Sequence, residues 1–250
     1  MTTLDFFSRK DKQKISMVTC YDATFAKLVN DSDVDCILIG DSCAMVMHGE
    51  STTIPATIEM LELHTKAVRK GAPNKFIVAD MPFLSTRKGL EYSVECAGRL
   101  IVAGANAVKI ERINTQPEII KHIVDSGIPV MAHLGLTPQF YNVLGGHKRQ
   151  GKTQEEAVKI IEEAELAVKC GCFSVLLECI PSEIAEQITK LIPVATIGIG
   201  SGTKTDGQVL VLQDMLGLTD FSPKFVTKYL DGSNLVKDAL NKYAKDVLEG

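Results

Sequence analysis

The stretch 107-AVKIE-111 is a short apolar, β-branched run that ends on an acidic residue. Runs of this kind recur along the chain and predict strands. They cover residues 15–19, 36–40, 76–79, 107–110, 129–132, 173–177 and 193–197, with a weaker run at 224–226. Segments with helical spacing lie between them, at 57–70, 93–103, 117–125, 154–168 and 182–191. Strands that are apolar on both faces and alternate with helices indicate a parallel sheet covered by helices.

Eight such strands in 250 residues favour an α/β fold, a (β/α)8 TIM barrel, over an open doubly wound sheet, although periodicity alone does not separate the two. We expect one barrel domain over residues 1–250, because chains split into domains beyond roughly 250 to 300 residues. The clearest helix is 154–168, where Thr153 and Glu156 predict a capping box and Gly171 predicts the end.

The composition excludes several classes of protein. With 27 basic and 31 acidic residues, the chain lacks the positive charge that a nucleic-acid or anionic-membrane binder needs. No apolar run approaches the roughly 18 residues of a spanning helix, and the first residues lack the apolar core of a signal peptide. We therefore expect a cytoplasmic protein. The seven cysteines include no CxxC pair and are expected to be reduced, apolar side chains.

Ionisable residues follow several of the predicted strands. They are Asp41, Asp80, Glu111, His133 and Glu178. In a parallel barrel the carboxyl ends of all strands open onto one face, where barrel enzymes build their active sites. Each residue alone has an ordinary alternative, such as a helix cap, a turn or a surface ion pair. Their coincidence at matching positions predicts a shared site.

Lys109 and Glu111 are two residues apart on one strand, so both side chains point to the same face. At the mouth of a barrel, the carboxylates of Asp41, Asp80 and Glu111 would repel one another unless a cation lay among them. Oxygen ligands without cysteine or histidine at zinc spacing favour a hard ion, Mg²⁺ first.

The glycine-rich segment 197-IGIGSGTKTDGQ-208 fits no phosphate-binding motif. The dinucleotide fingerprint needs a glycine at Thr203, and the Walker A motif needs a glycine directly before Lys204. We expect its glycines to let the loop after the seventh strand turn tightly beside the site.

A series of stretches together resembles the ketopantoate hydroxymethyltransferase family. In order, from about residue 14 to residue 229, they are TCYDATFA, LIGDSCAM, STTIPATIEM, VADMPF, AVKIE, AHLGLTPQ, GGHKRQGK, LLECIP and IGIGSGTKTDGQVLVLQDMLG. The resemblance implies a barrel of the phosphoenolpyruvate mutase/isocitrate lyase-like type that binds Mg²⁺. It also implies hydroxymethyl transfer from 5,10-methylenetetrahydrofolate to 3-methyl-2-oxobutanoate through a stabilised enolate, giving 2-dehydropantoate for pantothenate biosynthesis.

The resemblance also implies roles for individual residues. The implied metal ligands are Asp41, Asp80 and Glu111, the last of them direct or through water. The implied substrate contacts are Asp41, Ser42, Asp80, Lys109 and His133, and Glu178 is the implied general base. One departure lies beside this set: the family usually has a glycine pair where this chain has Arg112 and Ile113.

The same resemblance implies a homo-oligomer, commonly a decamer of two stacked pentameric rings. The C-terminal segment 233–250 is expected to form an amphipathic helix with Leu235, Val236, Leu240, Tyr243 and Val247 on one side. That side is suited to packing on the barrel or on a neighbouring copy.

Two other functions fit the residues. One is a related Mg²⁺-dependent barrel that makes or breaks a bond in a 2-oxo acid without folate, as a lyase or a mutase does. The other is a barrel that binds a keto acid without catalysis. Folate dependence separates the first from the transferase, and binding without turnover would identify the second.

Overall fold

In the computed structural model, which describes residues 1–220 and 223–250, eight strands close into a barrel in chain order. The strands are β1 (Ile15–Thr19), β2 (Cys36–Ile39), β3 (Phe76–Asp80), β4 (Ala107–Glu111), β5 (Val130–Gly135), β6 (Ser174–Glu178), β7 (Ala195–Ile199) and β8 (Gly207–Leu210). Each pairs in parallel with the next. The Ile15 N–H donates to the carbonyl oxygen of Asp206 at 3.0 Å and joins β1 to the start of β8. The predicted barrel is confirmed.

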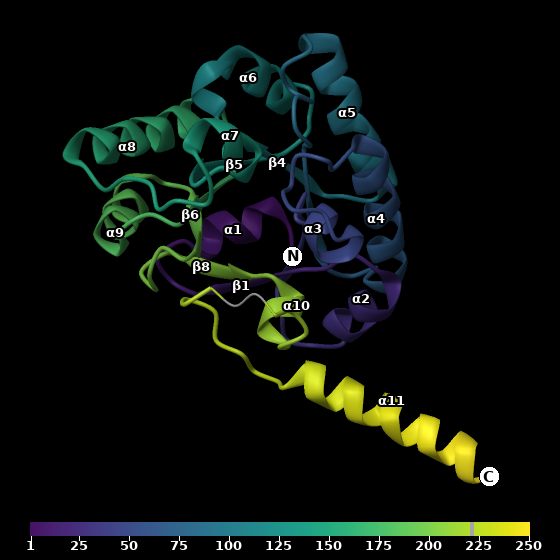
Figure 1. Ribbon diagram of the computed structural model, residues 1–250. Coiled ribbons are helices and arrows are strands. Elements are labelled where there is room, and N and C mark those ends of the chain that lie inside the picture. The colour runs from purple at the N-terminus through teal and green to yellow at the C-terminus, as the bar shows by residue number, and fades with distance from the viewer. Residues whose placement is uncertain (221–222) are drawn as a thin grey trace. The chain divides into compact units, whose positions relative to one another are not determined.

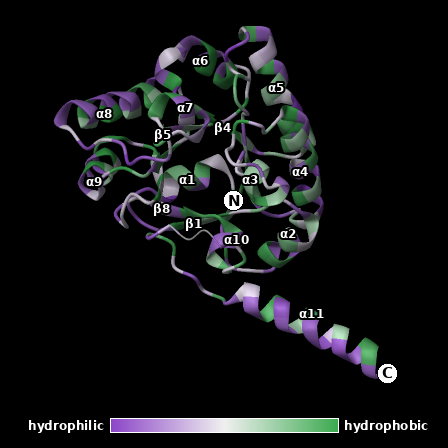
Figure 2. Cartoon of the chain, in the orientation of Figure 1, coloured by the Kyte–Doolittle hydropathy of each residue, from purple (hydrophilic) through white to green (hydrophobic). Residues whose placement is uncertain are grey.

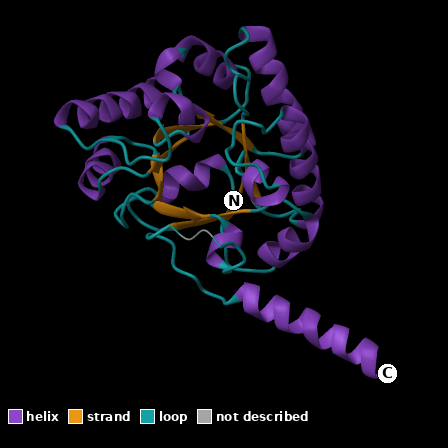
Figure 3. Ribbon diagram, in the orientation of Figure 1, coloured by secondary structure: helices purple, strands orange, loops and turns teal. Residues whose placement is uncertain are grey.

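Helices of the first 209 residues surround the ring of strands, as Figures 1 and 3 show. They are α1 (Thr3–Arg9), α2 (Ala23–Asn30), α3 (Cys43–His48), α4 (Ile58–Gly71), α5 (Leu90–Ala103), α6 (Pro117–Asp125), α7 (Tyr141–Leu144), α8 (Gln154–Lys169) and α9 (Ser182–Leu191). Two more helices follow β8 in the chain, α10 (Leu212–Met215) and α11 (Gly232–Glu249). The predicted capping box of α8 is present, because Thr153 Oγ1 accepts from Glu156 N at 3.2 Å and Glu156 Oε2 accepts from Thr153 N at 3.3 Å. Within the described ranges, no helix combines the length and the apolar composition that crossing a membrane requires.

The predicted strand at 224–226 is wrong, because the eighth strand is β8, inside the glycine-rich segment that we expected to be a loop. Residues 224 and 225 lie in a turn, and Val226 N donates to the carbonyl oxygen of Pro223 at 2.9 Å. β8 begins at Gly207, where a Cβ atom would lie 2.4 Å from the carbonyl oxygen of Ile15 and 2.6 Å from Ile197 Cδ1. The barrel closes here only around a glycine, and that glycine weakens the strand signal in the sequence.

Helix α1 covers the amino ends of the strands. Its buried Phe6 ring lies 5.4 Å from the ring of Phe76, which begins β3, and 5.0 Å from the ring of Phe173, which precedes β6. Burying an aromatic side chain in such a cluster stabilises the fold by a few kcal/mol at most, about 1.5 to 3. Apolar side chains therefore fill the centre of this end of the barrel, and the predicted site residues lie at the opposite, carboxyl ends.

The chain divides into two compact units, residues Met1–Val209 and Leu210–Gly250. The first holds the barrel. In the second, the chain returns along α10, with Tyr229 N donating to the carbonyl oxygen of Met215 at 2.8 Å and Gly232 N donating to that of Leu216 at 3.0 Å. Helix α11 then begins, and hydrophobic and hydrophilic residues alternate along it (Figure 2). The predicted amphipathic C-terminal helix is therefore present.

Candidate active site

The strand register brings the predicted site residues together at the carboxyl ends. Asp80, Glu111 and Glu178 are the last residues of β3, β4 and β6. Asp80 lies opposite Lys109 across β3 and β4, and Glu111 lies opposite His133 across β4 and β5. Because paired residues on parallel strands share a face, these side chains meet at the barrel mouth.

Asp41 and Asp80 are buried side by side in the site. The Asp41 N–H donates to Asp80 Oδ2 at 2.9 Å, and Lys109 Nζ lies 3.0 Å from Asp80 Oδ1. Burial raises the pKa of Asp41 well above its ordinary value, and the charges of Asp80 and Glu111 raise it further. Burial alone would lower the pKa of Lys109, but the surrounding carboxylates, Asp80 foremost, outweigh it and raise that pKa. The site therefore carries excess negative charge around one lysine.

His133 links two carboxylates. Its Nδ1 lies 3.3 Å from Glu111 Oε1, and its Nε2 lies 3.1 Å from Glu178 Oε2. Burial and the charge of Lys109 act to lower the pKa of His133, but Glu111 and Glu178 outweigh them and raise it to about 9. Lys109 Nζ also lies 3.1 Å from Nδ1, a contact in which Nδ1 accepts only when it carries no proton. The two carboxylates favour the protonated ring, so the ammonium group of Lys109 forms its ion pair with Asp80 instead.

Glu178 is the candidate carboxylate that solvent reaches. Its side chain is 19% exposed, whereas those of Asp80 and Glu111 are 2% exposed. The next residue, Cys179, adopts a left-handed backbone with φ 49°, and burial raises the pKa of its thiol to about 12. A thiol that stays protonated is a poor nucleophile, so the chemistry at this strand end falls to the carboxylate.

Two neutral residues that the strand-end pattern did not find complete the site. Gln139 Nε2 donates to Asp41 Oδ2 and to the carbonyl oxygen of Met81, both at 2.9 Å. The Tyr21 hydroxyl and Ser42 Oγ are hydrogen-bonded at 2.8 Å. Both additions lie in stretches that carry the family resemblance, TCYDATFA and AHLGLTPQ, which is the signal that points to them.

The donor set can be tested against Mg²⁺, which usually takes one or two protein carboxylates and completes its shell with water and substrate oxygens. Asp80 Oδ1 and Glu111 Oε1 are buried without a hydrogen bond and have only the contacts with Lys109 and His133 given above. Among the residues that the structure describes, no three His, Cys, Asp or Glu side chains are grouped so that they could hold a metal ion. The residues therefore fit an ion held by a pair of carboxylates, not a closed cage of protein ligands.

A pocket of about 320 Å³ opens beside the carboxylates. Its lining residues are Met81, Phe83, Leu84, Thr86, Arg87, Ile110, Glu111, Gln139 and Phe140. Glu111 and Gln139 belong both to this pocket and to the site, since Gln139 N donates to Glu111 Oε2 at 3.2 Å. A molecule bound in the pocket would therefore lie next to a molecule bound among the carboxylates.

Solved structures of other proteins have the same barrel architecture. The phosphoenolpyruvate phosphomutase from Streptomyces platensis subsp. rosaceus superposes with a TM-score of 0.69 at 12% identity, covering 98% of this chain and 88% of that one. The 2,3-dimethylmalate lyase, a PEP mutase/isocitrate lyase superfamily member, gives a TM-score of 0.65 at 14% identity, covering 98% and 88%. The chain thus shares the barrel fold of these proteins, the fold that was predicted.

Sequence comparison narrows the class to one family. The family model described as ketopantoate hydroxymethyltransferase matches residues 1–250. The 3-methyl-2-oxobutanoate hydroxymethyltransferase of Francisella tularensis subsp. tularensis (strain FSC 198) is 54% identical, covering 98% of this chain and 93% of that protein. The enzyme of the same name from Coxiella burnetii (strain CbuK_Q154) is 53% identical, covering 99% and 94%.

The chain belongs to the ketopantoate hydroxymethyltransferase family. Its activity is that of a 3-methyl-2-oxobutanoate hydroxymethyltransferase, in pantothenate biosynthesis, and family membership implies methylenetetrahydrofolate as the co-substrate. This finding confirms the predicted function and decides against the lyase and the non-catalytic binding protein.

Proposed function

We propose that Glu178 is the general base of this reaction and removes the proton from C3 of 3-methyl-2-oxobutanoate. The observation that carries the proposal is its position: a partly exposed carboxylate whose Oε2 lies 3.1 Å from His133 Nε2, at the edge of a buried charged cluster. A base must reach its proton and be held in one orientation. Protonated His133 supplies that orientation, and partial exposure supplies the access.

The remaining residues of the cluster hold the substrate in the proposed reaction. Lys109, His133 and Ser42 bind its carboxylate and keto oxygens. Asp41 and Asp80 would be the pair of carboxylates that holds Mg²⁺, and Glu111 would contribute directly or through water. When bound, Mg²⁺ supplies a Lewis acid that stabilises negative charge on the keto oxygen. The raised pKa of Asp41 supports a cation among these carboxylates, because burial and like charges disfavour its ionised form until a positive charge arrives.

The proposed steps account for every atom. The C3–H bond breaks, its proton passes to Glu178, and the electron pair stays on the substrate as the enolate. C3 then forms a bond to the one-carbon unit of 5,10-methylenetetrahydrofolate. Water provides the hydroxyl group of 2-dehydropantoate, and both carbon–nitrogen bonds that hold the one-carbon unit to the folate break. The remaining proton of the water and the proton taken by Glu178 pass to the two folate nitrogens, and tetrahydrofolate leaves.

Glu178→Gln tests the base. We expect turnover to fall at least ~10²-fold with little change in keto-acid binding, on the usual scale for general base catalysis. Proton NMR in D₂O with Mg²⁺ and no folate isolates the step, because exchange of the C3 proton should be lost as well. Glu183→Gln, a change of an exposed glutamate in the first turn of α9, is the matched control. Normal exchange in Glu178→Gln would rule out the assignment.

We further propose a homo-oligomer, commonly a decamer in this family, located in the cytoplasm. The free state of all seven cysteines supports a reducing compartment. The apolar residues of α11 support the oligomer, since a helix with a broad exposed apolar side is suited to pack on a partner.

A further inference from the structure

The pocket beside the site has a chemical character unlike that of the carboxylate cluster. Apolar side chains line most of it, including Met81, Phe83 and Leu84. It shares Glu111 and Gln139 with the site, so its ligand would lie against the bound keto acid. Its volume is at the small end for ligand sites, roughly 300 to 1,000 Å³. A pocket of this size and lining is suited to one flat part of a larger molecule.

Two arginines lie over the same aromatic ring of this pocket. The guanidinium carbon of Arg87 is 5.6 Å from the centre of the Phe140 ring, and that of Arg112 is 5.0 Å from it. Arg112 Nε donates to Thr137 Oγ1 at 3.2 Å, and Arg87 donates to the carbonyl oxygen of Arg112 at 3.3 Å and also to Thr115 Oγ1. Arg112 has φ 53°, a strained conformation for a residue with a side chain. The fold thus holds two like charges close together.

Carboxylates act on these two arginines without forming an ion pair, Glu111 on Arg87 and Glu163 on Arg112. Among the described residues, ion pairs between arginine and carboxylate are formed by Arg9 and Arg99, and by neither Arg87 nor Arg112. Paired guanidinium groups without an ion-paired carboxylate are suited to bind an anion, because each presents several donors in a planar fork.

We propose that this pocket is the folate subsite and that Arg87 and Arg112 bind the glutamate carboxylates of 5,10-methylenetetrahydrofolate. The proposal rests on the proposed function only in taking folate as the one-carbon donor. The keto acid is small and has no aromatic group, whereas the folate joins flat rings to an anionic tail. Its rings match the apolar wall of Met81, Phe83 and Leu84, and its tail matches the two arginines that lie over Phe140. The wall shared with Glu111 and Gln139 is where the transferred carbon must reach the keto acid.

Calorimetric binding of two compounds tests the subsite. Tetrahydrofolate and tetrahydropteroate differ only in the glutamate. We expect the unmodified protein to bind tetrahydrofolate roughly 10- to 100-fold more tightly, the range expected for charged hydrogen bonds. Arg87→Gln combined with Arg112→Gly should remove this preference. Glycine at 112 suits the left-handed backbone, so this change protects the fold. Arg99→Gln, which breaks an ion pair between α5 and α4, is the matched control and should keep the preference.

Two outcomes would overturn the subsite. One is equal binding of both compounds by the unmodified protein, and the other is a preference that survives in the double variant. Circular dichroism and an unchanged unfolding midpoint establish that the double variant is folded, and each single variant repeats the measurement if it is not. Because calorimetry measures binding alone, these outcomes do not bear on Glu178. Conversely, normal C3 proton exchange in Glu178→Gln would reject the base and leave the subsite intact.

Discussion

Lys109 is the residue on which the charge balance of the site depends. It is buried, 3.0 Å from Asp80, with the negative charges of Asp41 and Glu111 also acting on it. Removing one partner of a buried ion pair leaves an uncompensated charge, at a cost of about 3 to 5 kcal/mol. We therefore expect Lys109→Met to lower the free energy of unfolding by about that amount. Urea denaturation in EDTA measures it.

The matching double variant separates charge from packing. Adding Asp80→Asn to Lys109→Met removes the uncompensated carboxylate and should restore part of the lost stability. If the double variant loses as much free energy of unfolding as the two single variants together, the pair does not couple and the electrostatic explanation fails.

Among single residues, the strand-end pattern of the sequence predicted the charged residues of the site and not the neutral ones. Asp80, Glu111 and Glu178 end apolar strands, where a charge stands out against the pattern. Gln139 follows Pro138 in a short 3₁₀ turn, and Tyr21 follows β1 in a loop. Neutral polar residues in loops are common, so only the folded chain reveals that these two contact Asp41 and Ser42.

Among the elements, β8 closes the barrel and depends on a single glycine. A Cβ atom at position 207 would lie 2.4 Å from a backbone oxygen of β1, so Gly207→Ala requires the backbone to move. We expect a loss of at least about 1 to 3 kcal/mol in the free energy of unfolding, the usual cost of overpacking. Gly98→Ala is the control, because a Cβ atom there meets nothing within 4 Å and helix α5 should gain about 1 kcal/mol. Equal shifts of the thermal unfolding midpoint in Gly207→Ala and Gly98→Ala would contradict this explanation.

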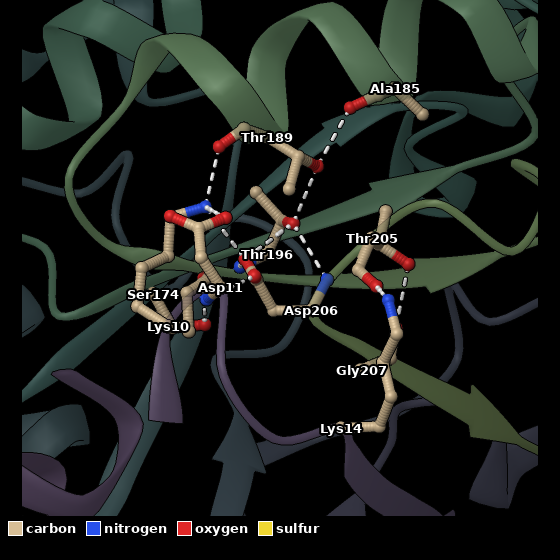
Figure 4. A network of polar contacts seen from close by, with 11 residues as sticks. Lys10, Asp11, Lys14, Ser174, Ala185, Thr189, Thr196, Thr205, Asp206 and Gly207 are labelled. Atoms are coloured by element: carbon tan, nitrogen blue, oxygen red, sulfur yellow. Dashed lines mark hydrogen bonds and ion pairs between the residues drawn. The ribbon is translucent and has the colours of Figure 1, made fainter. Parts of the chain in front are cut away.

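Asp206 joins the N-terminal segment to β7 and β8 at the amino ends of the strands, away from the candidate active site (Figure 4). Its Oδ2 accepts from Lys10 Nζ at 2.9 Å and from Thr196 N at 2.8 Å, and its Oδ1 accepts from Asp11 N at 3.1 Å. Burial alone would raise the pKa of Asp206, but these hydrogen bonds, with Thr196 the strongest, outweigh it and lower that pKa below 3.8. The carboxylate therefore stabilises the fold at neutral pH.

The sign of this shift predicts a pH dependence. A lowered folded-state pKa gives stability that is complete above the ordinary value of 3.8 and is lost as the pH falls through the folded value. Asp206→Asn should therefore cost about 1 to 3 kcal/mol in the free energy of unfolding at pH 7, and the cost should shrink below pH 3.8. Urea denaturation at both pH values measures the difference. If the stability lost in Asp206→Asn were the same at both pH values, the charge of Asp206 would not contribute to the stability of the fold.

The elements show where sequence reasoning succeeds and where it fails. Helices α6 and α9 have the predicted bounds, because a proline at the start, Pro117 in α6 and Pro181 before α9, and an apolar stripe mark them. Strand β8 was misplaced because it has four residues and begins with a glycine, so neither length nor β-branching distinguishes it from a loop. Its pairing with β7 is set by barrel closure, a property of the whole ring that no local pattern carries.

Across the barrel as a whole, stability and chemistry lie at opposite ends. Apolar rings under α1 and the Asp206 network occupy the amino ends, while buried charges occupy the carboxyl ends. A cluster such as Asp41, Asp80 and Glu111 costs stability, so the rest of the fold must offset it. This division explains why the carboxyl ends can carry a reactive site without loss of the barrel.

Residues 210–250 include helix α11, whose exposed apolar residues predict that copies of the chain assemble. On α11, Leu235, Leu240, Tyr243 and Val247 are 56% to 69% exposed, although burying each would contribute about 1.5 to 3 kcal/mol. We expect light scattering to give a mass well above the 27.2 kDa of one chain, and Leu240→Glu to lower it by weakening contacts between copies. Lys242→Glu, a change of an exposed charged residue on the same helix, should leave the mass unchanged. A single-chain mass for the unmodified protein would reject the homo-oligomer, and an unaltered mass for Leu240→Glu would reject α11 as its contact.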